Sequence, residues 1–149
     1  RIGGEMVPYK ATAGTLLIKD DKGDPKASVF YVAYTRSDVK DLSQRPVAFL
    51  YNGGPGSSSV WLHMGAFGPK RVVTTNAAPT PPAPYQLEDN ADTLLDKADL
   101  VFIDAVGTGY SKAVGKAQNK DFWGIDQDVE AFAQLASSSS ASGVNSTVS

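Results

Sequence analysis

The chain has 149 residues, of which 42% are hydrophobic and 20% charged, as in an ordinary soluble globular domain. Its 14 basic and 16 acidic residues nearly balance, which argues against a nucleic-acid or membrane-surface partner. The absence of cysteine excludes disulfides and thiolate metal sites, and the single histidine, His63, excludes a multi-histidine site, so we expect no cofactor. No apolar stretch is long enough to span a bilayer, and we expect no signal peptide within this chain.

Two strand-like segments open the chain. Residues 9–18 and 27–36 are rich in β-branched and aromatic side chains. The intervening stretch KDDKGDPK combines charge with Gly23 and Pro25, which marks a loop. The pattern predicts an N-terminal antiparallel hairpin.

Two later apolar runs each end in a polar, glycine-rich turn. The run at 46–51 (PVAFLY) leads into NGGPGSSS at 52–59, and the run at 99–103 (DLVFI) leads into DAVGTGYS at 104–111. Short continuous apolar runs are typical of strands that are buried on both faces. We therefore expect an α/β fold, in which ligands bind beyond the carboxyl ends of the strands.

The remaining segments predict a short helix, a loop, a longer helix and a tail. Residues 57–65 can form a helix that the serines cap, whereas the proline-rich stretch 68–84 is loop-like. Residues 122–134 place apolar side chains at helical spacing. Seven of the fifteen residues at 135–149 are serine, which predicts a disordered tail after a domain at 1–134.

The glycine loop at 52–59 predicts an anion site. Glycine permits positive φ and close backbone approach, and a helix start leaves N–H groups unpaired. Those groups can hold a phosphate or the oxyanion of an acyl-transfer intermediate. The loop lacks the Lys-Ser/Thr ending of a nucleotide-binding loop, which disfavours phosphate.

The stretch FLYNGGPGSSSVWLHMGAFGP, followed by DLVFIDAVGTGYS, resembles the serine carboxypeptidase family of α/β-hydrolases. The resemblance implies a carboxypeptidase or carboxylesterase that cleaves peptides or esters, in a periplasmic or secreted location. It implies that Asn52 binds the substrate carboxylate, that Gly53 and Gly54 form the oxyanion hole, and that Tyr110 lies in the substrate site.

The sequence departs from this family in several places, among them a turn at 104–107 that is one residue shorter than the family's common version. Leu50 stands where the family often has tryptophan, and Ser57 stands where it usually has cysteine. No G-x-S-x-G nucleophile elbow occurs. We therefore expect an incomplete α/β-hydrolase sheet, truncated before the usual elbow.

A substitute catalytic group is conceivable from the residues alone. Ser59 and His63 are four apart on the expected helix, and Asp104 follows a strand end, so the three can form a makeshift triad. In the alternative interpretation, the serine caps the helix and His63 packs beside Trp61 and Met64.

Two other classes of function stay open at this point: an inactive fragment or interaction module, and a small anion-binding domain. An open sheet also exposes an unpaired strand edge and an apolar face. We therefore expect self-association through that edge, with Phe49, Tyr51, Val101 and Ile103 uncovered.

Overall fold

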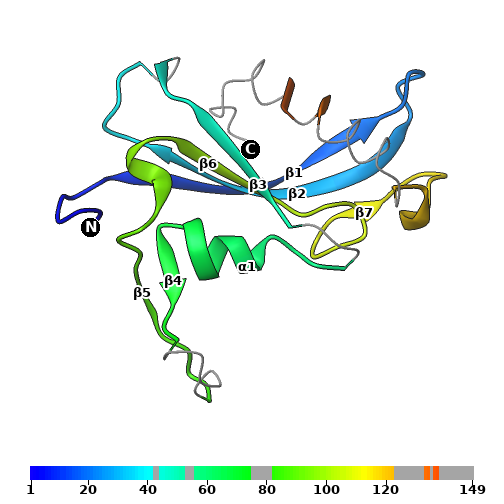
Figure 1. Cartoon of the computed structure of the whole chain (residues 1–149). Helices are drawn as coiled ribbons and strands as arrows, with labels where there is room; N and C mark the ends of the chain where they lie inside the picture. The colour runs from blue at the N-terminus through cyan, green and yellow to red at the C-terminus, as the bar shows by residue number, and fades with distance from the viewer. Residues whose placement is uncertain (42–43, 53–55, 75–81, 123–132, 135, 138–149) are drawn as a thin grey trace.

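The computed structural model describes residues 1–41, 44–52, 56–74, 82–122, 133–134 and 136–137 (Figure 1). Its main element is a mixed sheet in the order β1-β2-β6-β3, with a short β7 paired to β2. These strands are β1 (Tyr9–Lys19), β2 (Pro25–Arg36), β3 (Val47–Tyr51), β6 (Asp99–Ile103) and β7 (Lys112–Ala113). A mixed sheet with a helix packed on it agrees with the α/β class.

The long strands β1 and β2 pair antiparallel along their whole length. Burial alternates along β1, where Leu16 and Ile18 pack into the core while Leu17 is exposed. The turn between the strands is closed by Asp20, whose carboxylate accepts backbone N–H bonds from Lys22 (2.9 Å) and Asp24 (2.8 Å). Aspartate commonly closes turns in this way.

Strand β6 is the centre of the sheet. It pairs antiparallel with β2 on one side and parallel with β3 on the other, and all five of its residues are buried. Val101 and Ile103 pack into one hydrophobic cluster, whereas Leu100 and Phe102 belong to a second cluster. Burial of each such side chain contributes about 2 kcal/mol. The prediction of a strand buried on both faces is confirmed here, and the expectation that Val101 and Ile103 would be uncovered was wrong.

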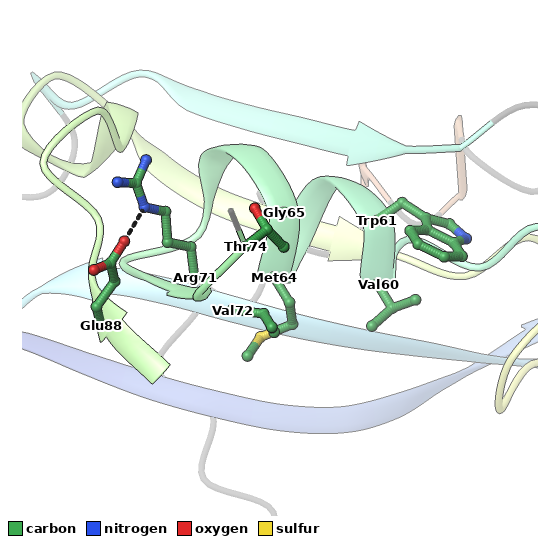
Figure 2. A pocket seen from close by; sticks show the side chains of 8 residues that line it. All are labelled: Val60, Trp61, Met64, Gly65, Arg71, Val72, Thr74 and Glu88. Atoms are coloured by element: carbon green, nitrogen blue, oxygen red, sulfur yellow. Dashed lines mark hydrogen bonds and ion pairs between the residues drawn. The ribbon is translucent and has the colours of Figure 1, made fainter. Parts of the chain in front are cut away.

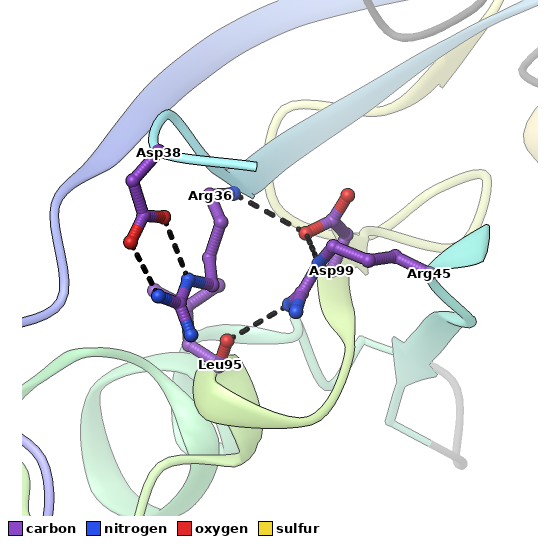
Figure 3. Close-up of polar contacts among 5 residues, drawn as sticks. All are labelled: Arg36, Asp38, Arg45, Leu95 and Asp99. Atoms are coloured by element: carbon purple, nitrogen blue, oxygen red, sulfur yellow. Dashed lines mark hydrogen bonds and ion pairs between the residues drawn. The ribbon is translucent and has the colours of Figure 1, made fainter. Parts of the chain in front are cut away.

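A buried ion pair holds the start of β6 (Figure 3). The Arg45 guanidinium lies 2.9 Å from the Asp99 carboxylate, and it also donates to the Leu95 carbonyl at 2.9 Å. The backbone N–H of Arg36 reaches the same Asp99 oxygen at 3.3 Å. Because Arg45 precedes β3 and Asp99 begins β6, the pair fixes where these two strands start relative to each other.

Strand β3 differs from its prediction, because it is not buried on both faces. Val47 is 42% exposed and Tyr51 is 51% exposed, and the three residues between them are only partly buried. Within the described residues β3 pairs with β6 alone, so it lies at the edge of the sheet. An apolar run cannot distinguish an edge strand from a central one.

The predicted helix after the glycine loop is present but shifted. It consists of α1 (Val60–Leu62), which continues directly into a π-helical turn, η2 (His63–Phe67). Leu62 and Phe67 pack with the cluster that contains Leu100 and Phe102, so the helix covers that face of the sheet. Figure 1 shows α1 running below β3 and β6.

The side chains of Asn90 and Thr93 hold the end of this helix. Asn90 Nδ2 donates to the carbonyls of Ala66 (2.6 Å) and Gly68 (2.8 Å), and Thr93 Oγ1 donates to that of Phe67 (2.6 Å). They satisfy carbonyls that a helix end leaves without partners.

The stretch predicted as loop contains a strand. β4 (Lys70–Val72) pairs antiparallel with β5 (Leu87–Asp89) and carries the Arg71–Glu88 ion pair across the ladder. The partner strand lies beyond the proline-rich stretch, so the local sequence does not reveal the pairing. Two 3-10 turns, η3 (Leu94–Asp96) and η4 (Asn119–Phe122), complete the described elements.

Several predictions lie outside the described residues. They include most of the helix expected at 122–134, most of the tail at 135–149, and the glycines Gly53 and Gly54. The boundary between domain and tail therefore stays a prediction. None of the described helices is long and apolar enough to cross a membrane.

Candidate active site

The two glycine-containing turns lie at the same edge of the sheet. β3 and β6 run parallel, so the described residues that follow their carboxyl ends, Asn52 and 56–59 after β3 and 104–111 after β6, lie at the same end of the sheet. In the first segment Asn52 Nδ2 donates to Ser57 Oγ at 3.1 Å, and Gly56 adopts a φ of 84°. A side chain rarely tolerates that φ, so glycine is required at the turn into the helix.

Asp104 joins the two segments. One carboxylate oxygen accepts hydrogen bonds from the backbone N–H of Ser59 (2.8 Å) and from its hydroxyl (3.0 Å). The other oxygen accepts the backbone N–H of Tyr110 at 3.2 Å. Asp104 is only 4% exposed and Ser59 only 7%, so these bonds are sheltered from water. Hydrogen bonds to a buried carboxylate are stronger than those between neutral groups.

The turn that carries Asp104 is fixed by its own bonds. Ser111 Oγ donates to the Asp104 carbonyl and accepts the Phe30 N–H, both at 2.7 Å, and Thr108 Oγ1 donates to the Ala105 carbonyl at 2.7 Å. These contacts tie the turn to β2 as well as to itself. The position of the carboxylate is therefore set by the sheet.

His63 faces the sheet from the helix. Its Nε2 lies 2.6 Å from the Tyr34 hydroxyl, and its ring stacks on Phe102 with 4.6 Å between the centroids. Burial lowers the pKa of His63, and the charge of Asp104 opposes this in part. Burial also raises the pKa of Tyr34. Both shifts favour neutral rings, so the bond joins two uncharged groups, and the histidine tautomer decides which of them donates.

The three residues predicted as a makeshift triad are thus divided between two contacts. Ser59 bonds to Asp104, whereas His63 bonds to Tyr34. His63 and Ser59 lie one helical turn apart, and the backbone N–H of His63 donates to the Ser59 carbonyl at 2.9 Å. In the part of the chain that the structure describes, no hydrogen bond joins the His63 ring to the Ser59 hydroxyl. The contact of His63 with Tyr34 gave no signal in the sequence.

The side chain of Tyr110 lies on the solvent side of its turn. Tyr110 is 78% exposed, and its ring contacts Phe30 at a centroid distance of 5.2 Å. Its backbone is held by Asp104 while its side chain reaches solvent. Nothing is described for Gly53 and Gly54, so their part in the site stays a prediction.

A pocket of about 500 Å³ opens on the outer side of the helix (Figure 2). It is lined by Val60, Trp61, Met64, Gly65, Arg71, Val72, Thr74 and Glu88. Arg71 and Glu88 form a 2.7 Å ion pair on it, and Trp61 is 70% exposed. The sequence did not predict this pocket, because three of its eight lining residues, Arg71, Val72 and Glu88, come from β4 and β5. The apolar residues on one side of α1 were its only signal.

Comparison with known proteins gives the chain its family. A profile of the serine carboxypeptidase family matches residues 3–135. Two sequences of pheromone-processing carboxypeptidase KEX1 from Saccharomyces cerevisiae strains are each 31% identical, over 74% and 79% of this chain. This chain covers only 14% and 16% of those proteins.

A solved structure agrees. The crystal structure of KEX1(delta)p, a prohormone-processing carboxypeptidase from Saccharomyces cerevisiae, has a TM-score of 0.53 and 28% identity. The match covers 70% of this chain and 20% of that one. The profile match spans most of the sequence and contains both turns described above. The chain therefore belongs to the serine carboxypeptidase family.

Proposed function

We propose that this chain supplies the carboxylate-binding and oxyanion-binding part of a serine hydrolase that removes C-terminal residues from peptides or cleaves related esters. Family membership supports a hydrolase. The observation that carries the proposal is the junction at Asp104, which joins the residues after β3 to the turn after β6 at the carboxyl ends of these strands. The carboxyl ends of the strands are where α/β sheets bind ligands.

Each residue of the junction has a proposed role. The Asn52 amide donates to the substrate's C-terminal carboxylate, and its bond to Ser57 orients it. The N–H of Gly54, with Gly53 beside it, stabilises the oxyanion that forms on the attacked carbonyl. Tyr110 offers an exposed ring against the substrate.

We further propose that Ser59, His63 and Asp104 support the site rather than perform the chemistry. A serine nucleophile needs a base within hydrogen-bond reach. The Ser59 hydroxyl donates to Asp104, and the His63 ring is bonded to Tyr34. No G-x-S-x-G elbow occurs within residues 1–149, so the proposal assigns the nucleophile to none of the residues of this chain.

A fluorophosphonate probe tests this assignment. The full chain is treated with the probe, and intact-mass and peptide-mapping mass spectrometry locate any adduct. We expect no stoichiometric adduct from a preparation with a cooperative unfolding transition. A full adduct on Ser57, Ser58 or Ser59 that His63→Ala abolishes would instead establish the makeshift triad.

The other functional classes have their own signatures. A small anion-binding domain would bind phosphate as well as a peptide carboxylate. An interaction module would bind neither. Self-association through the β3 edge predicts a mass that rises with concentration in sedimentation. We also propose a periplasmic or secreted location, which rests on the family resemblance alone.

A further inference from the structure

We infer that Asp104 is a positioning residue, which holds the loop stem, Asn52 and residues 57–59 of the proposed substrate-binding loop, against the end of β6. The inference rests on the proposed function, because the loop matters only if it binds substrate. Asp104 itself is not assigned a contact with substrate. It acts through Ser59 and Tyr110.

Asp104 collects three hydrogen-bond donors from two segments. Its carboxylate receives the N–H and hydroxyl of Ser59 on one oxygen and the N–H of Tyr110 on the other. Within the described residues no lysine or arginine forms a salt bridge with it. A buried carboxylate is stable only when hydrogen bonds compensate its lost hydration. The two backbone segments are therefore held where those bonds can form.

The space around the carboxylate is closed by a glycine. Gly109 has a φ of 51°, and a Cβ there would lie 1.9 Å from the Asp104 carboxylate oxygen and 3.1 Å from the Ser58 Cβ. Any side chain at 109 would push apart the two segments that Asp104 joins. The absence of a side chain at Gly109 thus lets the turn after β6 pack directly against the Asp104 carboxylate and Ser58.

The loop stem is tied at both of its described ends. Asn52 bonds to Ser57, and Ser59 bonds to Asp104. Since Ser57 and Ser59 are two residues apart, displacing Ser59 also displaces the partner that orients the Asn52 amide. Asp104 therefore controls the direction of the proposed carboxylate donor.

Amide hydrogen exchange by NMR on the full chain tests this inference. We expect Asp104→Asn to speed exchange at Ser59 and Tyr110 about tenfold or more, since it exchanges a charged acceptor for a weaker one. Exchange at Val101, in the core of β6, should stay within about twofold. The matched control is Asp20→Asn, whose carboxylate also accepts two backbone N–H groups but in an exposed turn.

A second readout follows the site. A blocked dipeptide with a free carboxylate should bind Asp104→Asn about fivefold or more weaker than Asp20→Asn. If Asp104→Asn does not fold, Ser59→Ala removes one of the donors and should still speed exchange at residue 59 and at Tyr110 selectively.

The outcomes separate the inference from the proposed function. Unchanged exchange at Ser59, or an equal rise at Val101, would overturn the positioning role. Local exchange as expected, together with no dipeptide binding by the unaltered chain, would keep the positioning role and reject the proposed function.

Discussion

Two buried aspartates lie at opposite ends of the same strand, and they are held in different ways. Asp99 begins β6 and pairs with the Arg45 guanidinium (Figure 3), whereas Asp104 follows β6 and accepts only from N–H and hydroxyl groups in the described contacts. Both are 4% exposed. An ion pair thus fixes where strands start, whereas hydrogen bonds to backbone set the loops at the functional end.

The largest expected effect comes from breaking the ion pair. Arg45→Met leaves the Asp99 carboxylate buried without its cation, so we expect a loss of about 3 kcal/mol in the free energy of unfolding. Urea denaturation measures it. A loss below about 1 kcal/mol would mean that Asp99 is hydrated in solution and that the two ends are not as different as their burial indicates.

A somewhat smaller effect should follow at the other end. Gly109→Ala introduces a Cβ at a positive φ and against the Asp104 carboxylate, which should cost about 2 kcal/mol. Gly23→Ala is the control, because it also has a positive φ (86°) but a Cβ there meets no atom within 4 Å. Equal losses in thermal unfolding for both variants would assign the effect to backbone strain alone.

The helix side of the site should respond less. Tyr34→Phe removes the hydroxyl that bonds His63 Nε2 and leaves that nitrogen half-buried without its partner. We expect a loss of about 1 kcal/mol, measured by urea denaturation. Tyr31→Phe serves as control on the same strand. An equal loss in the free energy of unfolding for Tyr31→Phe would show that the Tyr34–His63 bond does not stabilise the fold specifically.

The same histidine predicts a pH dependence. Burial lowers the pKa of His63 below its usual 6.5, so the unfolded chain takes up a proton before the folded chain does. The stability contributed by neutral His63 is therefore complete above pH 6.5, and is lost as the pH falls from there through the lowered pKa. We expect the melting temperature of the unaltered chain to fall more steeply than that of His63→Phe as the pH is lowered from 7.5 to 5. Equal slopes for the two chains would show that this proton is not involved.

The smallest effect is expected on the surface. Arg71 pairs with Glu88 at 2.7 Å, but both side chains are more than two-fifths exposed. Arg71→Ala should change the free energy of unfolding by less than about 1 kcal/mol. A loss in urea denaturation as large as that of Arg45→Met would remove the contrast between buried and exposed pairs.

The local sequence predicts that a segment forms a strand better than it predicts which strands lie beside it. The run DLVFI predicts β6 correctly because a central strand contributes side chains to both clusters. The equally apolar β3 looked the same, but its place at the edge depends on which strands pair. That information is not local.

The site shows the same limit. The two glycine turns are visible as motifs, and parallel strands bring them together. The bonds that organise them join residues far apart, since Ser59 and Asp104 are separated by 45 positions and Tyr34 and His63 by 29. Helical spacing alone suggested a pair between Ser59 and His63. The sheet beneath the helix offers His63 a phenol and an aromatic ring, and this could not be read from the spacing.

The most direct test of the proposed function is recognition of a substrate carboxylate by the loop after β3. An NMR titration compares a blocked dipeptide acid with its C-terminal amide, and follows the Asn52 side-chain amide together with the Gly53 and Gly54 N–H signals. We predict that the acid shifts these signals, that the amide does so at least about tenfold more weakly, and that Asn52→Ala removes the difference. Equal binding of acid and amide, or shifts confined to the pocket beside Trp61, would contradict the proposed function.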